Sequence, residues 1–103
     1  MEIEQDQMRE RLRGKFVRAV ESIGGKLEHA SKFEEAVVLY SRGIEADELV
    51  EPFYRGLMRC YQRLDRHSEA ASAFRRLRQT LSITLGATPS AETQKLFQEL
   101  ELH

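Results

Sequence analysis

A pattern of apolar and small residues occurs twice in this chain, and the two copies are 34 residues apart at every position. The first copy consists of Val20, Ile23, Gly24, Leu27, Ala36 and Tyr40. The second consists of Tyr54, Leu57, Met58, Tyr61, Ala70 and Phe74. A fixed interval of this size is typical of repeat proteins, whose units stack because none can bury its apolar face alone. We therefore expect two stacked copies of one structural unit.

Apolar residues along the whole chain recur every three or four positions, which is the spacing of amphipathic helices. The five runs are Met8, Leu12, Phe16, Val20, Ile23 and Leu27; Phe33, Val37, Tyr40 and Ile44; Phe53, Leu57, Tyr61 and Leu64; Ala70, Phe74, Leu77 and Leu81; and Leu96 and Leu100. No segment alternates with a period of two, so no strands are predicted. The sequence therefore predicts an all-α protein of five helices.

Prolines and hydroxyl residues indicate where the later helices begin. Pro52 and Pro89 both lie where a helix would start, a position that does not need the amide that proline lacks. Ser68 is predicted to cap the fourth helix, and either Thr88 or Ser90 the last one. The connections between helices are short, so we predict one domain.

Two adjacent glycines, Gly24 and Gly25, fall inside the first predicted helix. Each glycine in a helix interior costs roughly 1 kcal/mol relative to alanine. Close packing would account for Gly24, but nothing in the pattern accounts for Gly25. We expect a kink there.

The interval and residue pattern resemble the tetratricopeptide repeat, a pair of antiparallel helices. The resemblance implies an array with repeats at about 17–50 and 51–84 and a capping helix at about 90–101. A small residue in each copy would let the second helix of a pair approach the first, and an aromatic one turn later would fill the gap. We expect the packing to involve Gly24, Ala36, Tyr40, Leu57, Tyr61, Ala70 and Phe74.

A longer set of residues supports a more specific resemblance. It comprises Tyr40, Ile44-Glu45-Ala46-Asp47, Glu51-Pro52-Phe53-Tyr54, Leu57-Met58, Tyr61, Arg66, Glu69-Ala70, Phe74, Leu77, Leu85-Gly86-Ala87-Thr88-Pro89-Ser90, Glu92-Thr93 and Leu96-Phe97. From Arg11 to Leu100 the chain is similar to the bacterial transcriptional activation domain. The segment from Leu85 to Thr93 is the most specific part, because repeat proteins in general lack it. The chain departs from the family at Asp65, where a glycine is usual in the tight turn.

In that family a tetratricopeptide-like domain follows a winged helix-turn-helix in transcriptional regulators. The resemblance implies that this chain regulates transcription through protein contacts, and that DNA is read only by a winged-helix domain absent from the chain. We expect either an excised C-terminal piece or a free-standing adaptor module. Expected partners are other domains of the same regulator, the transcription machinery, or a second copy.

The first helix of each pair should line a concave surface where a partner can bind. The positions carried over are Arg18, Glu21, Glu28 and His29 in the first repeat and Arg55, Arg59, Gln62 and Arg63 in the second. We predict that Arg18, Arg55, Arg59, Gln62 and Arg63 bind the partner. Three of these arginines are four residues apart and share one face, where a partner's carboxylate would relieve their repulsion.

An alternative is that the chain itself neutralises this arginine row. Glu21 or Glu28 could do so, as could the second helix, because residues 34–51 carry six acids against one arginine. Residues 52–78 carry seven arginines against two acids. Under the partner hypothesis, charge reversal at Arg59 should spare the fold and weaken binding.

Two further interactions remain open. Met8, Leu12 and Phe16 extend beyond what two repeats need to cover, and could form a dimer seam or pack on a missing neighbouring domain. Arg75, Arg76 and Arg78 could contact DNA, but their helix needs its other side for the core, and the net charge of −1 argues against strong phosphate binding.

The composition favours a cytoplasmic binding protein over an enzyme. Cys60 is the only cysteine, the N-terminus is acidic, and no apolar run approaches the roughly 18 residues that cross a bilayer. His29 and His67 have no neighbouring cysteine or carboxylate at a metal-ligand spacing. There is no glycine-rich phosphate loop. We therefore predict no catalysis, no metal and no cofactor.

Overall fold

The computed structural model describes residues 2–100, with side chains from residue 4 onward. Within this range every regular element is a helix, so the prediction of an all-α protein of five helices is confirmed. The helices are α1 (Glu2–His29), α2 (Phe33–Ala46), α3 (Glu51–Arg63), α4 (His67–Leu85) and α5 (Ala91–Glu99).

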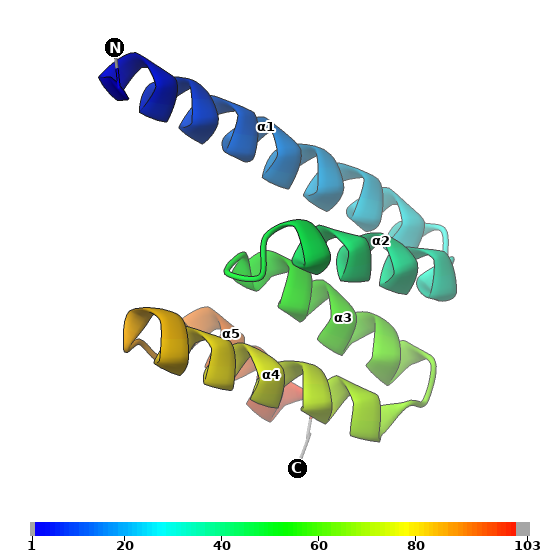
Figure 1. Ribbon diagram of the computed structural model, residues 1–103. Coiled ribbons are helices and arrows are strands. Elements are labelled where there is room, and N and C mark those ends of the chain that lie inside the picture. Colours follow the sequence, from blue (N-terminus) through cyan, green and yellow to red (C-terminus); the bar gives the residue numbers. More distant parts are fainter. Residues whose placement is uncertain (1, 101–103) are drawn as a thin grey trace.

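Helices α1 to α4 lie side by side in chain order, each antiparallel to the one before, and α5 lies behind α4 (Figure 1). Packed pairs are α1 with α2, α2 with α3, α3 with α4, and α3 with both α1 and α5. This is a tetratricopeptide-like helical array. The N-terminal half of α1 extends beyond the other helices, because α1 has 28 residues and α2 only 14.

The core lies between neighbouring helices and is centred on the repeated residues. Ala36 and Ala70 are both 0% exposed, which allows α2 and α4 to approach the helices beside them closely. Tyr40, Leu57 and Phe74 are also buried, whereas Tyr61 is half-buried.

Two glycines from different helices enclose the ring of Tyr40. A Cβ atom on Gly24 of α1 or on Gly56 of α3 would overlap atoms of this ring. The repeat pattern assigns Met58 to the usual glycine position, but the close approach in the second copy occurs at Gly56, two residues earlier. Three helices can therefore close around one aromatic side chain only because two Cβ atoms are missing.

Gly25, unlike Gly24, has free space where a side chain would begin. A Cβ atom there would have nothing within 4 Å, and α1 continues through it as an α-helix. Figure 1 shows no break in α1 at this position, so the expected kink does not occur as an interruption.

The turns explain one departure from the family pattern and correct one predicted cap. Asp65 has φ 59°, a left-handed conformation that glycine adopts freely and that aspartate tolerates better than most residues. Because this turn is tight, α4 begins at His67 and Ser68 lies inside the helix rather than at its N-cap. At α5 Ser90 is the cap, and its hydroxyl accepts a hydrogen bond from the Thr93 amide at 3.3 Å.

Candidate partner-binding groove

A groove of about 540 Å³ lies between α1, α3 and α5. Its walls are Gly25, Glu28, His29, Phe33, Arg59, Gln62, Arg63, Leu96 and Leu100. Five of these residues belong to the predicted concave surface: Glu28, His29, Arg59, Gln62 and Arg63. The groove therefore forms where the C-terminal half of α1, the first helix of the first repeat, runs beside the C-terminal half of α3, the first helix of the second repeat.

Arg59 is held by an internal carboxylate at one side of this groove. Its Nε donates to Oε1 of Glu28 at 2.9 Å, and its Nη2 donates to Oε2 at 3.1 Å. The Tyr40 hydroxyl donates to the same Oε2 at 2.7 Å. The Glu28 side chain is only 16% exposed, whereas that of Arg59 is 41% exposed, so only the carboxylate end of this bidentate pair is shielded from water. At Arg59 the arginine row is therefore neutralised by the chain itself.

The ionisation of Glu28 depends on these two donors. Burial alone would raise the pKa of the Glu28 carboxyl, but hydrogen bonds from Arg59 and Tyr40, together with the guanidinium charge, hold it below its usual value. Burial and the nearby Glu28 charge raise the pKa of the Tyr40 phenol. At neutral pH the cluster is therefore a carboxylate, a guanidinium and a neutral phenol.

Arg55 lies outside the groove and holds α5 in place. Its Nη1 donates to the Thr93 hydroxyl at 2.8 Å, and its Nη2 is 3.7 Å from Glu92. The side chain is only 14% exposed, so a partner in the groove cannot reach it easily. Arg18 is also outside, on the exposed surface of α1. The structure thus brings together three of the five predicted partner-binding residues: Arg59, Gln62 and Arg63.

Arg63 is the arginine of the row that remains available. Its guanidinium lies over the ring of Phe33, 4.7 Å from the centroid, which fixes its position. No carboxylate of residues 4–100 lies within 4 Å of it. Leu96 and Leu100 form an apolar wall of the same groove. Leu96 belongs to α5 and Leu100 follows that helix directly, and the repeat pattern does not predict where α5 packs.

A buried threonine attaches α5 to the array. Thr93 is 0% exposed, and its hydroxyl bonds both Arg55 and the Oε1 atom of Glu51, the latter at 2.9 Å. The same Glu51 oxygen accepts from the Ser90 amide at 2.9 Å. These residues lie in or beside the segments that carry the family resemblance, but their spacing alone did not indicate this contact.

We expect Thr93→Val to destabilise the protein by about 1–2 kcal/mol, because it removes the buried hydroxyl that hydrogen-bonds Arg55, Glu51 and Ser90. Urea unfolding monitored by circular dichroism measures this loss. Thr84→Val is the control, since Thr84 is exposed on α4. Equal stability of the two variants would show that the Thr93 contacts contribute nothing.

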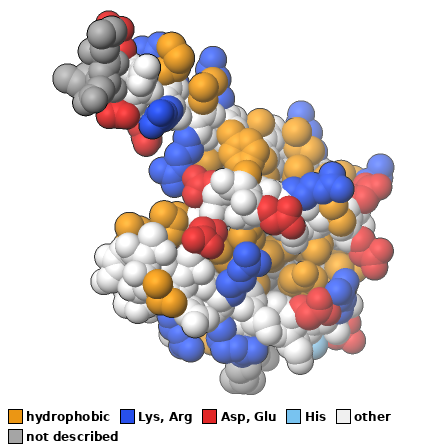
Figure 2. Space-filling view, viewed as in Figure 1, with side chains coloured by type: hydrophobic (Ala, Val, Ile, Leu, Met, Phe, Trp, Pro, Cys, Tyr) orange, Lys and Arg blue, Asp and Glu red, His pale blue; other side chains and the backbone are white. Residues whose placement is uncertain are grey.

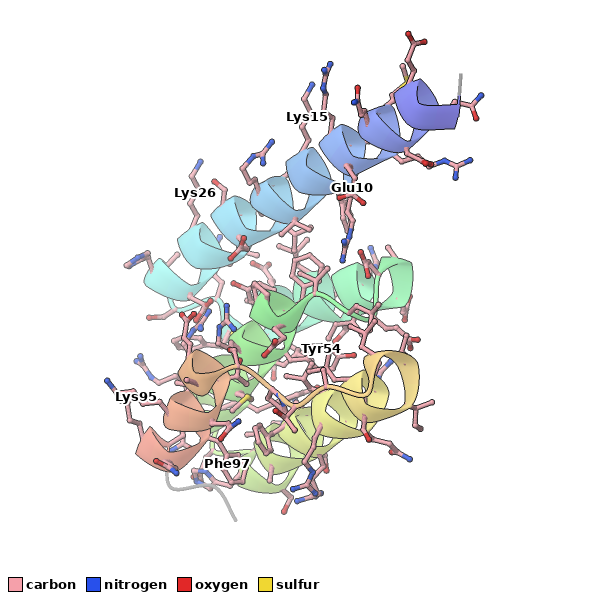
Figure 3. The ribbon with its side chains drawn as sticks, turned by 90° about the vertical axis from the view of Figure 1, so that its left-hand side faces the viewer. Glu10, Lys15, Lys26, Tyr54, Lys95 and Phe97 are labelled. Carbon is pink, nitrogen blue, oxygen red and sulfur yellow. The ribbon has the colours of Figure 1, made fainter. Side chains whose placement is uncertain are left out.

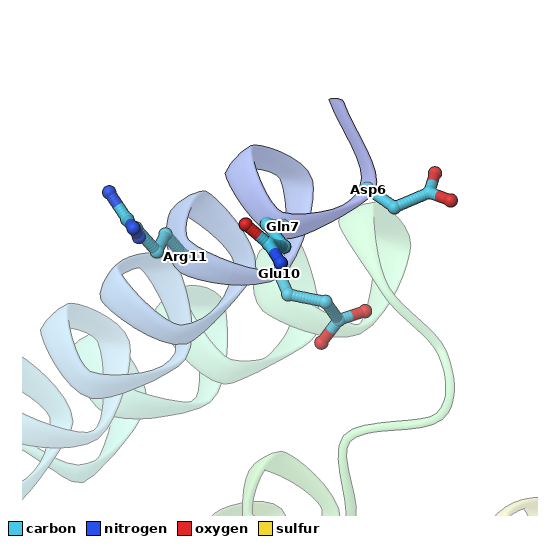
Figure 4. A pocket seen from close by; sticks show the side chains of 4 residues that line it. All are labelled: Asp6, Gln7, Glu10 and Arg11. Atoms are coloured by element: carbon cyan, nitrogen blue, oxygen red, sulfur yellow. The ribbon is translucent and has the colours of Figure 1, made fainter. Parts of the chain in front are cut away.

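Other surface features offer less to a ligand. Among the residues whose side chains are described, Asp6, Gln7, Glu10 and Arg11 line a hollow of about 540 Å³ beside the first turns of α1 (Figure 4). All four come from one helix. Among residues 2–100, no group of three or more histidine, cysteine or acidic side chains is arranged to hold a metal. Burial raises the pKa of the Cys60 thiol to about 12, so it stays protonated at neutral pH.

Comparison with known proteins agrees with the helical fold. No curated protein and no solved structure is detectably similar to the chain. None of the described helices combines the length and apolar character needed to cross a bilayer. A family model described as the bacterial transcriptional activator domain matches residues 3–101, nearly the whole sequence. The chain therefore belongs to the bacterial transcriptional activator domain family, whose members have a regulatory role in transcription.

Proposed function

We propose that this chain is a cytoplasmic protein-interaction domain of a transcriptional regulator, and that it binds a segment of a partner protein in the groove between α1, α3 and α5. It acts by binding rather than by catalysis and needs no cofactor. Repeats at about 17–50 and 51–84 supply two walls of the groove, and the helix at about 90–101 supplies the third. DNA is read by a separate domain. The observation that carries the proposal is Arg63, a fixed cation without an internal carboxylate, beside an apolar wall.

The chemistry of the groove defines the segment that fits it. A partner carboxylate can accept two hydrogen bonds from the guanidinium of Arg63. An apolar side chain next to that carboxylate would cover Leu96 and Leu100, which are half-buried. Glu28 repels further acidic residues at the other end of the groove. We therefore expect a short segment with one acidic residue beside a large apolar one.

The variant that tests this proposal is Arg63→Glu rather than the reversal of Arg59. A glutamate at Arg59 would remove the bidentate pair with Glu28 and place two carboxylates side by side, so a loss of binding in that variant would not separate an effect on the groove from an effect on the fold. Arg63 is exposed and forms no ion pair with a carboxylate of residues 4–100, so its reversal removes only the contact with Phe33 and a favourable charge in the last turn of α3. Arg75→Glu on the exposed side of α4 is the matched control.

We expect Arg63→Glu to weaken binding of acidic–apolar peptides roughly 10- to 100-fold, since a hydrogen-bonded charge pair contributes about 1.5–3 kcal/mol. Peptides selected against the wild-type chain from a random library would be titrated by fluorescence anisotropy against each variant. Arg75→Glu should bind them with unchanged affinity. The groove is not the site if both variants bind alike, or if the selected peptides contain no acidic residue.

A further inference from the structure

The exposed side of α1 carries a row of large apolar residues, which we name the α1 stripe: Met8, Leu12, Phe16 and Ile23. They are 63%, 60%, 37% and 50% exposed. Their spacing of four, four and seven residues places them on one face of the helix. Figure 2 shows hydrophobic side chains following one another along α1. An exposed apolar row of this length marks an interaction site more often than a free surface.

The α1 stripe is continuous with the core at one point only. The ring of Phe16 meets the buried ring of Phe53 edge-on, with the centroids 6.0 Å apart. On the same helix Arg13 bonds Asp47 at 2.6 Å, which ties α1 to the turn between α2 and α3. These two contacts attach the stripe to the array near its middle.

Basic side chains border this stripe on both edges. Arg9, Arg11, Lys15 and Lys26 are each one or three residues from a member of the stripe, so they lie beside it on the helix. No carboxylate of residues 4–100 lies within 4 Å of any of these four. Figure 3 shows Lys15 and Lys26 pointing away from the other helices.

Between Arg9 and Lys26, the acids of α1 lie away from this surface. Glu10 is two residues from both Met8 and Leu12, and Glu21 is two residues from Ile23, so both lie on the far side of the helix from the stripe. Figure 3 shows Glu10 directed away from the side on which Lys15 projects. The exposed face of α1 from Arg9 to Lys26 thus combines an apolar centre with edges of one charge sign.

We propose that the α1 stripe docks an amphipathic helix with acidic edges, contributed by a partner protein. A row at four-residue spacing is the kind of ridge that packs into the groove of another helix. From Met8 to Ile23 the row is about 22 Å long, which matches a partner helix of roughly four turns. Acidic residues beside the partner's apolar face would neutralise the unpaired bases of α1.

Charge argues against two other occupants. A second copy of this chain paired through the stripe in a two-fold arrangement would bring each basic edge against itself, for example Lys15 near Arg11 of the other copy. An anionic bilayer would be attracted by the same basic edges, but it would also meet the rest of a chain whose net charge is −1, whereas a helix meets only the stripe. The groove that contains Arg63 lies on a different side of α1, so this proposal does not depend on it.

The test uses two synthetic helical peptides of about 18 residues, each with leucines on one face, flanked by glutamates in one and by lysines in the other. Their binding to the full chain is measured by fluorescence anisotropy. We expect the glutamate peptide to bind at least roughly tenfold more tightly than the lysine peptide. Equal affinities, or a preference for lysine, would overturn the proposal.

Two variants locate the binding surface. Leu12→Asp changes an exposed member of the stripe and should weaken binding of the glutamate peptide at least roughly tenfold. Ile83→Asp introduces the same charge at a residue of α4 that is 76% exposed and should leave the affinity unchanged. Circular dichroism melting verifies that both variants stay folded. Binding that survives in Leu12→Asp would place the peptide elsewhere.

The remaining outcomes distinguish the other occupants. Sedimentation equilibrium should show a monomer at the concentrations used for peptide binding. A dimer that dissociates in Leu12→Asp would assign the stripe to a second copy and overturn the proposal. Flotation with phosphatidylserine vesicles should leave the chain unbound, and flotation abolished by Leu12→Asp would assign the stripe to a membrane instead.

Discussion

Gly24→Ala should destabilise the protein by about 1–3 kcal/mol, while Gly25→Ala should stabilise it by roughly 0.5–1 kcal/mol. Both changes add one methyl group to neighbouring positions of α1 and bring the same gain in helix propensity. At Gly24 the new carbon overlaps the hydroxyl end of Tyr40, which is buried and cannot move freely. At Gly25 the new carbon has nothing within 4 Å.

The difference between the two variants isolates the steric cost from the propensity gain. We expect it to be roughly 2–4 kcal/mol, because displacing Tyr40 would also strain its hydrogen bond to Glu28. Guanidinium unfolding at neutral pH measures both free energies of unfolding. Gly24→Ala combined with Tyr40→Phe should not recover the loss, since the Cζ and Cε1 atoms of the ring also overlap the new carbon and the hydrogen bond to Glu28 is removed. Equal effects of the two alanines would mean that α1 does not approach α2 as closely as the structure shows.

The fold could be predicted from the sequence because its main determinants are periodic. The helical spacing and the 34-residue interval can be recognised without knowing which residues contact one another in the folded protein. The positions of the closely packed glycines could not be predicted from this periodicity. The pattern assigns the second close approach to Met58, but the ring of Tyr40 reaches α3 at Gly56. The position that must be glycine depends on how deeply a ring from a neighbouring helix inserts. The spacing of residues along one helix does not predict that depth.

The groove could be predicted only in part for a similar reason. The three arginines of the row occupy equivalent positions in the sequence pattern, but each contacts a different side chain. Arg55 contacts Thr93 of α5, Arg59 contacts Glu28 of α1, and Arg63 contacts Phe33 of α2. These partners lie 38, 31 and 30 residues away along the chain. The choice among them depends on where α5 and the end of α1 pack, which no local pattern determines. The sequence could therefore identify the row of arginines but not its available member.

Glu28→Ala should lower the free energy of unfolding at neutral pH by about 1–3 kcal/mol, because it removes the acceptor shared by Tyr40 and Arg59. The lower end of this range reflects the exposure of Arg59, whose side chain is 41% accessible and can turn to water. Tyr40 has no such freedom, since it is 2% exposed between two glycines. The cost therefore arises mainly at the phenol, which links the wall of the groove to the centre of the core.

The pH dependence of stability provides the sharper test of this cluster. Since the folded-state pKa of Glu28 is lowered, its contribution is complete above the unfolded pKa of about 4.3 and is lost as the pH falls through the lower folded value. On acidification the free energy of unfolding of the wild type should therefore fall more than that of Glu28→Gln, which has no ionisable group at position 28. The gap between them should be largest near neutral pH and shrink below about pH 4. Glu35→Gln, an exposed substitution on α2, should match the wild type at neutral pH. A constant gap at every pH would show that the charge of Glu28 does not stabilise the fold.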